Sequence, residues 1–476
     1  MSNSYLYLTV LVSAIGGLLF GYDIGVISGV LEMPKFKETF NWESPLEKGF
    51  IVSSLHLGCL LGCIISSWMC DGLGRRWSII LGALVFCIGG FLQTLATSLP
   101  LLFSGRIISG VAIGTLSMAV PLFLAEISPK HLRGRLVSCQ QLAITMGILI
   151  SFCVNLACSS IEDHGSWRIP LGMQMIISSL MAFGMLFLPA SPRWLMSRGR
   201  VDQAATSLRR IRGSAGPEVQ QELDEVQDSI RLEREIGHGT WKECFANGMW
   251  RRTLIGITLQ AFQHLTGINA ILYYAPQVVQ AAGFNNLQVA LFATAGTGLI
   301  NMCMTLPGIY LVDRVGRRVL LVSGGIMCAV WMCLLGILMA IYGPAYDVKA
   351  IPFLCLAAIY LFTASFAYSW GPTSWVYPSE LYPLRIRAKA MSMTTASNWI
   401  FNFLVAQAVP GLLQSINWGL YLIFAGFGLG MALWVYFAVP ETKGKSLEEV
   451  DAIFGHSRPQ HYTETYMKQY LPIGGH

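Results

Sequence analysis

Long uninterrupted apolar stretches dominate the chain, and each is long enough for one helix to cross a bilayer, which takes about 20 residues. We predict twelve membrane-spanning helices, at residues 6–30, 49–70, 78–98, 102–124, 136–158, 169–189, 253–275, 287–311, 319–342, 350–376, 391–413 and 418–439. A β-barrel is excluded, because transmembrane strands alternate apolar and polar residues and these stretches do not. The predicted fold class is an all-α polytopic membrane protein.

Composition supports this interpretation. The chain has 476 residues, of which 54% are hydrophobic and 12% charged, whereas soluble domains carry about 25% charged residues. So few charges cannot cover a soluble protein of this size, and intrinsic disorder needs the opposite composition. The first span has no basic residues before it, and we interpret it as a retained helix and not a cleaved signal peptide.

The basic residues are unevenly distributed among the connections between the predicted spans. Of 32 Lys and Arg, 26 lie in the connections that follow even-numbered spans and in the C-terminal tail, and five lie in the other connections. The positive-inside rule therefore predicts that the even-numbered connections and both termini are cytoplasmic. The net charge of +6 then reflects topology, so we expect no nucleic-acid partner. We expect a multi-pass protein of the plasma membrane.

The chain also contains an internal repeat. Asp71-Gly-Leu-Gly-Arg-Arg76 follows span two and Asp313-Arg-Val-Gly-Arg-Arg318 follows span eight, while a Glu…Arg motif beginning at Glu126 after span four returns at Glu380 after span ten. Two six-helix halves of one plan are therefore predicted. The expected division is residues 1–189 for the N-terminal half, 190–252 for cytoplasmic linker helices, 253–440 for the C-terminal half and 441–476 for a cytoplasmic tail.

In such two-half proteins the substrate binds between the halves, which rock against each other. The repeated charges are predicted to form a cytoplasmic latch of Asp71, Arg75, Arg76, Glu126, Arg133, Asp313, Arg314, Arg317, Arg318, Glu380 and Arg387. Pairs between the halves would hold the cytoplasmic side shut in the outward-open state. The alternative is that the basic residues only enforce topology, but topology does not explain why acids recur with them.

Two ionisable residues lie inside predicted spans, where such groups are costly and mark functional sites by default. Asp23 lies in the middle of span one and Arg106 near the start of span four. We predict that they pair. A carboxylate whose cationic partner can move away would alternate between its protonated and ionised forms, as proton coupling requires. A static structural ion pair is the alternative.

Neutral polar side chains form a second group within the spans. They are Gln141, Gln260, Gln263, His264, Asn269, Asn301, Asn398 and Asn402. Amides both donate and accept hydrogen bonds and so match a neutral ligand rich in hydroxyls. Trp375 follows a Gly-Pro break in span ten and could stack on a sugar ring. For any one residue the alternative is interhelical hydrogen bonding, and His264 could be a packing residue.

The sequence contains neither a P-loop nor a His/Cys spacing typical of metal sites. We therefore expect a protein that is neither an enzyme nor an ATP-driven pump, with no cofactor and no metal.

The motifs and their order resemble the sugar-porter family of the major facilitator superfamily over nearly the whole chain. The matching stretches are Gly21-Tyr-Asp, Asp71…Gly-Arg-Arg, Gly105-Arg106, Glu126…Arg133-Gly, Gln140-Gln141-Leu, Pro189-Ala-Ser-Pro-Arg, Gln263-His-Leu-Thr-Gly-Ile-Asn269-Ala-Ile-Leu-Tyr-Tyr274, Asp313…Gly-Arg-Arg, Glu380…Arg387, Ser397-Asn-Trp and Pro440-Glu-Thr-Lys-Gly. Fungal monosaccharide–proton symporters are the most similar members.

This resemblance implies a monosaccharide site built from Gln141, Gln260, Gln263, Asn269, Asn301, Trp375 and Asn398, with Tyr273 and Tyr274 near the exterior gate. It also implies proton coupling through Asp23 and Arg106, and import of a hexose or pentose together with protons by one monomer. A facilitative uniporter, a polyol transporter and a transporter-like sugar sensor are the alternatives.

Three positions depart from the family pattern. His264 stands where the family usually has a second Gln, which places a titratable group at the expected site. Ala190 replaces the usual Glu of the Pro-Glu-Ser-Pro-Arg motif, so one cytoplasmic acid is missing. Gly72 stands where an Arg usually follows the acid.

Overall fold

A computed structural model describes residues 4–129, 132–214, 216–237, 240–246, 248–342, 350–383, 386–445, 449–450 and 453–454, and within them the regular structure is helical. The helices are α1 (Ser4–Val30), α2 (Pro34–Phe40), α3 (Pro45–Gly72), α4 (Arg75–Thr94), α5 (Leu99–Ile127), α6 (Arg133–Cys158), α7 (Gly165–Leu186), α8 (Pro192–Ser197), α9 (Val201–Arg212), α10 (Pro217–Ile236), α11 (Met249–Leu265), α12 (Ile268–Tyr273), α13 (Ala275–Ala281), α14 (Leu287–Arg314), α15 (Arg317–Tyr342), α16 (Ile351–Tyr368), α17 (Trp370–Leu381), α18 (Arg387–Ile416) and α19 (Gly419–Ala438).

Within the described ranges, eleven helical segments are long and apolar enough to cross a membrane. The predicted seventh span, 253–275, is not among these segments. Its first part, α11, has 17 residues and a length of about 26 Å at 1.5 Å per residue, short of the roughly 30 Å hydrocarbon core. This broken crossing is completed by α12 and α13, and with the eleven segments it makes up the predicted twelve spans.

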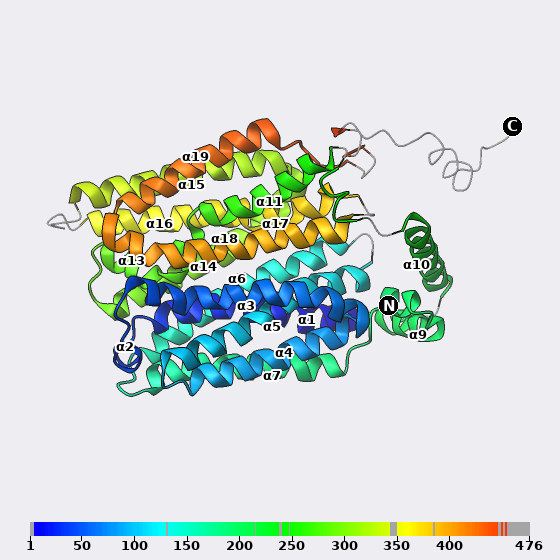
Figure 1. Ribbon diagram of the computed structural model, residues 1–476, viewed down its shortest axis with the longest axis horizontal. Helices are drawn as coiled ribbons and strands as arrows, with labels where there is room; N and C mark the ends of the chain where they lie inside the picture. The colour runs from blue at the N-terminus through cyan, green and yellow to red at the C-terminus, as the bar shows by residue number, and fades with distance from the viewer. Residues whose placement is uncertain are drawn as a thin grey trace.

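The two halves repeat the same helix packing. In the first half α1 packs on α6, α3 on α5, and α4 on α7; in the second half α11 packs on α18, α14 on α16, and α15 on α19. Figure 1 shows the halves as two layers, with α1 to α7 in blue and cyan below α11 to α19 in green to orange. The observed packing matches the internal repeat of the charged motifs, and the fold confirms the predicted all-α class.

Small residues bring some of these helices into backbone contact. Gly58 of α3 and Gly110 of α5 face each other, and a β-carbon added to Gly58 would overlap the carbonyl group of Ile107. Contacts of this kind between small residues are a common basis of helix association in membranes. They hold α3 against α5, and α3 is one of the helices that meet the other half.

Two helix pairs join the halves: α3 packs on α18, and α6 packs on α14. These pairs occupy equivalent positions in the repeat. The residues that carry polar contacts between the halves lie on α3, α12, α13, α14 and α18 and in the connections that follow α1 and α6, and those nearest the site are described below.

Short helices lie outside the spans, and α8, α9 and α10 fall within residues 190–252, where we predict a linker. α9 and α10 lie beyond one end of the bundle and α2 lies at the other end (Figure 1). The linker helices share a small apolar cluster of Leu195, Met196, Ala204, Leu208, Val219, Leu223 and Ile230. The exact boundaries of the two halves, linker and tail stay a prediction.

Candidate functional site

Two backbone breaks in the seventh crossing position its polar side chains. The first is at Gly267, between α11 and α12, with φ of +90°, a conformation that residues with a β-carbon rarely adopt. A β-carbon here would also lie 2.7 Å from ring atoms of Phe424. The second break is at Tyr274, and Pro276 follows it in the first turn of α13, where no N–H donor is needed. The polar residues gather on both sides of the first break.

The tenth crossing is also broken, but not where the sequence predicted. The break is at Ser369, between α16 and α17, and not at Gly371-Pro372, because a proline is tolerated in the first turn of a helix. The indole of Trp370, next to the break, is fully buried and donates to the carbonyl of Leu321 at 3.0 Å. Trp375 lies one turn further along α17, partly buried.

Three predicted site residues form what we call the amide cluster: Gln260 and Gln263 of α11, and Asn398 of α18. The amide nitrogen of Asn398 donates to Gln260 Oε1 at 2.6 Å and to Gln263 Oε1 at 2.9 Å. Gln260 in turn donates to the carbonyl of Ser374 at 2.9 Å, and Gln263 to that of Trp370 at 3.4 Å. All three amides are buried. The cluster therefore holds α11, α17 and α18 together with side chains that a hydroxyl group could also bind.

Five further side chains form a hydrogen-bonded ladder, which we define as His264, Asn269, Asn402, Tyr273 and His56. Asn269 Nδ2 lies 2.7 Å from His264 Nδ1 and donates to Asn402 Oδ1 at 2.6 Å. The Tyr273 hydroxyl donates to the same oxygen at 3.3 Å and lies 2.8 Å from His56 Nε2. All five are buried. The ladder thus crosses from α11 of the second half to α3 of the first.

The remaining predicted sugar-site residues lie apart from these hydrogen bonds. Asn301 is buried in α14, and Gln141 is half-buried in α6, with its amide nitrogen 3.7 Å from where a β-carbon of Gly371 would stand. Gln141 of the first half therefore faces the start of α17 in the second. Tyr274, predicted at the exterior gate with Tyr273, donates to the carbonyl of Ala406 at 2.7 Å.

Asp23 and Arg106 are brought together, both fully buried. Arg106 Nη2 lies 3.5 Å from Asp23 Oδ2 and 3.4 Å from the carbonyl of Val52, while Nη1 lies 3.5 Å from Gln93 Oε1. These distances are long for charge-assisted hydrogen bonds, which are usually about 2.7–2.9 Å. Within the described part of the chain, Asp23 Oδ1 and Arg106 Nε have no hydrogen-bond partner. The pair is close but loosely bonded.

Polar contacts tie the halves together toward the side that the sequence predicts to be exterior. Glu32, in the connection that follows α1, accepts from Gln277 of α13 at 2.6 Å and also pairs with Lys37 and Lys48. On α18, Gln407 Oε1 accepts from the Ser53 hydroxyl at 2.6 Å. These contacts, with the ladder, close the exterior ends of the two halves against each other.

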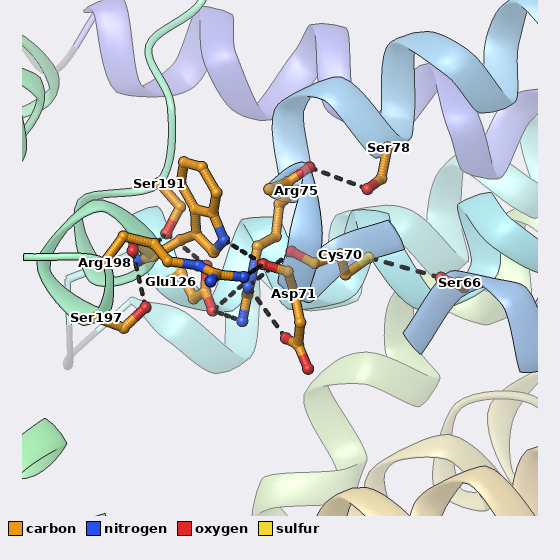
Figure 2. Close-up of polar contacts among 11 residues, drawn as sticks. Ser66, Cys70, Asp71, Arg75, Ser78, Glu126, Ser191, Ser197 and Arg198 are labelled. Carbon is orange, nitrogen blue, oxygen red and sulfur yellow. Dashed lines mark hydrogen bonds and ion pairs between the residues drawn. The ribbon is translucent and has the colours of Figure 1, made fainter. Parts of the chain in front are cut away.

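At the opposite end of the first half, the predicted latch residues form one network (Figure 2). Arg75 pairs with Glu126 at 2.9 Å and lies 3.5 Å from Asp71, four residues before it. Ser191 donates to the second carboxylate oxygen of Glu126 at 2.5 Å. Arg198 donates to the backbone carbonyl of Asp71. The network therefore joins the end of α3, the start of α4 and the end of α5 to the first residues of the 190–252 segment.

The second half repeats this network. Arg317 pairs with Glu380 at 2.8 Å and with Asp313 at 3.1 Å, and Thr442 donates to Glu380 at 2.7 Å, as Ser191 does to Glu126. Glu441 adds a contact that has no equivalent among the described residues of the first half. Its carboxylate accepts from the backbone N–H of Arg317 at 3.0 Å and from that of Arg318 at 2.9 Å. Ala190 stands at the matching position of the first half.

The other predicted latch residues make contacts inside their own half. Arg76 donates to the carbonyl of Met185, Arg318 to that of Tyr436, Arg387 to that of Tyr382, and the carbonyl of Arg314 accepts from Lys443. The side chain of Arg133 lies outside the described residues. Among the latch side chains that are described, each ion pair found joins two residues of one half. In this conformation the networks stabilise each half separately, and the latch between halves stays a prediction.

Sequence reasoning missed several of these residues. His56 was a detectable signal, since it is a polar residue in the middle of an apolar stretch, as His264 is. Glu441 could have been found by aligning Pro189-Ala-Ser with Pro440-Glu-Thr across the repeat. Gln93, which faces Arg106 and donates to Ser109 at 2.8 Å, carried no comparable signal, because its role depends on the packing of α4 against α5.

The fold and these networks define a two-half helical membrane protein of the major facilitator type, and comparison with known proteins gives its family. The profile described as "Sugar (and other) transporter" matches residues 9–454, and the chain belongs to this family. The assignment confirms the resemblance inferred from the motifs and the prediction that the protein is a transporter and not an enzyme.

Individual relatives are similar over nearly their full length. The MFS glucose transporter mfs1 of Aspergillus flavus is 36% identical over 474 residues, covering 94% of this chain and 89% of that protein. Sugar transport protein 7 of Arabidopsis thaliana is 37% identical, covering 95% and 91%. The structure of the proton:xylose symporter XylE bound to 6-bromo-6-deoxy-D-glucose superposes with a TM-score of 0.79 at 33% identity, covering 95% of this chain and 100% of that one.

Proposed function

We propose that this protein imports a monosaccharide together with protons by alternating access. The observation that carries the proposal is the fully buried pair of Asp23 and Arg106, whose closest atoms are 3.5 Å apart. A loosely bonded carboxylate at membrane depth can accept a proton at little cost in lost hydrogen bonds, and such a group is the element that proton coupling requires. The named proton:xylose symporter with the same fold supports this assignment.

A sugar is the substrate that the buried amides favour. Gln260, Gln263 and Asn398 offer both donors and acceptors, and they carry no net charge. The site is completed by Gln141, Asn269, Asn301 and His264, with the partly exposed indole of Trp375 available to stack on a sugar ring. Relatives named as glucose and sugar transporters support a monosaccharide. Hexoses and pentoses remain equal candidates, since they differ by one hydroxymethyl group.

Transport follows from rocking of the two halves, which polar contacts join at the predicted exterior end. The exterior contacts of Glu32, Ser53 and Tyr273 open when the halves rock apart, and the cytoplasmic networks then meet across the interface as the predicted latch. The distribution of Lys and Arg supports cytoplasmic termini, and both halves of the site lie in one chain, so a monomer suffices. We place the protein in the plasma membrane.

The test is uptake into proteoliposomes with an imposed proton gradient, using labelled glucose, xylose and galactose with and without a protonophore. Wild-type protein accumulates one of these sugars above equilibrium, and the protonophore abolishes the accumulation. Asp23→Asn loses accumulation and keeps sugar exchange at equal concentrations, because the site remains while the proton acceptor is gone. Glu235→Gln, an exposed acid of α10, is the matched control and keeps both activities.

A facilitative uniporter is the alternative function. The observed geometry of Asp23 and Arg106 favours it equally, because a static structural ion pair would have the same geometry in this conformation. Uniport predicts equilibration without accumulation in the wild type. Accumulation that survives Asp23→Asn unchanged would refute the role of this residue, whatever the sugar.

A further inference from the structure

The amide of Gln174 in α7 is fully buried and unbonded. Within the described part of the chain, neither its Nε2 nor its Oε1 atom has a hydrogen-bond partner. Most buried polar groups in folded proteins do have one, so an exception needs an explanation. Ser178, one turn further along the same buried face, is an ordinary case, since its hydroxyl donates to the carbonyl of Ala83 of α4. Gln174 therefore has a donor and an acceptor available for a partner that this conformation does not bring to it.

The packing of α7 against α1 places Gln174 level with Asp23. A β-carbon added to Gly16 of α1 would lie 3.0 Å from the terminal methyl carbon of Met181 of α7, so these two positions face each other. The first and sixth crossings run in opposite directions, and seven residues are close to two full helical turns. Seven residues forward from Gly16 is Asp23, and seven residues back from Met181 is Gln174. This register therefore predicts that the second pair faces across the same helix interface at the same depth.

Two further contacts support this position of Gln174. The Tyr22 hydroxyl of α1 donates to the carbonyl of Pro170 at 2.9 Å, and Pro170 lies one turn before Gln174 on α7. On the other side, a β-carbon added to Gly90 of α4 would lie 3.7 Å from the Cβ of Gln174. The side chain therefore begins between α1 and α4, with Asp23 on the first of these helices.

Asp23 also has an unused hydrogen-bonding atom. Within the described residues its Oδ1 has no partner, and its Oδ2 lies 3.5 Å from Arg106 Nη2. A second amide nearby is already bonded, because Gln93 of α4 accepts from Arg106 at 3.5 Å and donates to Ser109 at 2.8 Å. Gln174, by contrast, keeps its whole amide available for Asp23.

The ionisable side chains around Asp23 that the structure describes include no second acid at this depth. They are Arg106 of α5, His56 and Cys59 of α3, Tyr273 of α12, Cys153 and Cys158 of α6, and Arg168 at the exterior end of α7. The Tyr273 hydroxyl is bonded to Asn402 and lies beside His56. A proton on Asp23 is therefore not shared with another carboxylate.

The chemistry of an amide selects the neutral form of Asp23. A protonated carboxyl group presents one donor and one acceptor, and so does the end of a primary amide. The two groups can therefore form a ring of two hydrogen bonds, in which the carboxyl O–H donates to Gln174 Oε1 and Nε2 donates to the other carboxyl oxygen. An ionised carboxylate only accepts, so it leaves Oε1 without a donor. The ionised form pairs instead with the cation of Arg106.

We propose that Gln174 is the partner that Asp23 takes when it carries the proton. The inference rests on the proposed proton coupling through Asp23. When a proton binds the carboxylate, the attraction to Arg106 falls with the lost charge, and the carboxyl group and the amide turn to each other by changes of side-chain rotamer. Arg106 keeps Gln93 and the carbonyl of Val52 as acceptors. Gln174 is thus a positioning residue, which holds the proton on Asp23 without titrating itself.

Infrared difference spectroscopy reports the hydrogen bonding of a protonated carboxyl group directly. Spectra of the full-length protein in lipid nanodiscs are recorded in acidic and alkaline buffers without sugar, and the C=O band of neutral Asp23 is identified by its absence in Asp23→Asn. Gln174→Met keeps the length of the side chain and removes the amide. The band should then move to higher wavenumber, because a carbonyl that accepts fewer hydrogen bonds has a stiffer C=O bond.

The same spectra measure the proton affinity of Asp23. In Gln174→Met the midpoint of the band's pH titration should move by about one pH unit toward acid, a loss of about tenfold in affinity, since two neutral hydrogen bonds to the protonated form are removed. Ser178→Ala is the matched control. It removes a buried hydrogen bond from the same face of α7 and should leave both the band and its midpoint unchanged.

Thermal stability separates positioning from a structural role. Gln174→Met removes an amide that is unbonded in this conformation, so its melting temperature in detergent at alkaline pH should equal or exceed that of the wild type. Ser178→Ala should melt at a lower temperature, because it loses a hydrogen bond. A structural amide at position 174 would give a lower melting temperature in Gln174→Met as well.

Four results would overturn the inference: no band that disappears in Asp23→Asn, an unchanged band and midpoint in Gln174→Met, equal shifts in Ser178→Ala, or a lower melting temperature in Gln174→Met. None of these measurements involves transport. Failure of sugar accumulation in the uptake assay therefore bears on the proposed function alone, and an unchanged band in Gln174→Met bears on Gln174 alone.

Discussion

The asymmetry between Glu441 and Ala190 gives a prediction whose size can be worked out from the structure. Glu441 caps the N-terminus of α15: its Oε1 accepts from the backbone N–H of Arg317, Thr442 and Lys443 at 2.9–3.0 Å, and Oε2 accepts from that of Arg318 at 2.9 Å. Helix N-termini leave such N–H groups without partners and attract negative charge. Glu441→Gln should therefore destabilise the docking of the 440–445 segment.

The free-energy cost of Glu441→Gln follows from the hydrogen bonds that the Gln amide can still accept. The Gln oxygen can replace Oε1, but the amide nitrogen then faces the N–H of Arg318 as a second donor, so one hydrogen bond is lost. The remaining ones change from charge-assisted, at about 1.5–3 kcal/mol, to neutral, at about 0.5–1.5 kcal/mol. Because residue 441 is partly exposed and water can replace part of the loss, we expect a cost of about 2–3 kcal/mol, or about 30- to 150-fold in the local equilibrium.

Amide hydrogen exchange measures this local opening equilibrium at the N-terminus of α15. In Glu441→Gln, protection of the peptide that contains Arg317 and Arg318 should fall by about 30- to 150-fold at constant pH, since these amides exchange through local opening. The opposite change, the addition of an acid, can be made at the matching position of the first half. Ala190→Glu supplies the acid that the first half lacks, and it should increase the protection of the N–H groups of Arg75 and Arg76 at the start of α4.

Two results would contradict this reasoning. One is unchanged protection at Arg317 and Arg318 in Glu441→Gln. The other is a loss of protection at the start of α4 in Ala190→Glu, which would mean that the neighbouring Trp194 ring, 3.0 Å from where a β-carbon of Gly74 would stand, leaves no room for the carboxylate. Exchange at the distant α12 should not change in either variant.

Three further substitutions have defined outcomes. Glu32→Gln removes the charge that pairs with two lysines and weakens the contact to Gln277, and it should enlarge the population with separated exterior ends about tenfold, by electron–electron distance measurements. Gly267→Ala forces a positive φ on alanine and a contact with a phenylalanine ring, and it should cost about 1–3 kcal/mol, seen as a lower melting temperature in detergent. Arg317→Met should cost about 1–3 kcal/mol by leaving the partly exposed Glu380 without its cation, and a double variant with Glu380→Gln should recover much of that loss of stability.

The fold was predictable because a membrane imposes a length on every crossing. Ten of the predicted spans appear as continuous helices close to their predicted boundaries, and the tenth is interrupted only at Ser369, since an apolar stretch of sufficient length has no alternative in a bilayer. The break at Gly267 was not predictable by the same reasoning, because glycine is common in membrane helices and only the approach of Phe424 and the positive φ show why this one interrupts α11.

Which residues belong to the candidate site was easier to predict from the sequence than which of them contact one another. Polar side chains within apolar stretches singled out Gln260, Gln263 and His264, and charge within the spans singled out Asp23 and Arg106. Which amide faces which depends on the packing of α11 against α18, a contact between residues more than 130 positions apart. The ladder to His56 depends further on how the two halves meet, and no local pattern in the sequence contains that information.

The broken seventh crossing has a consequence for how the protein is made. α11 is short and carries buried arginine and amide side chains at positions such as Arg252, Gln260 and Gln263, so it is a poor candidate for insertion on its own. Its partner Asn398 is synthesised 138 residues after Gln260. During translation, the polar side chains of α11 therefore gain Asn398 as a partner only after α18 has been synthesised. The second half can then reach its final topology only after most of the chain has left the ribosome. Substitutions in α18 that remove Asn398 should then reduce the yield of inserted protein before they affect its transport.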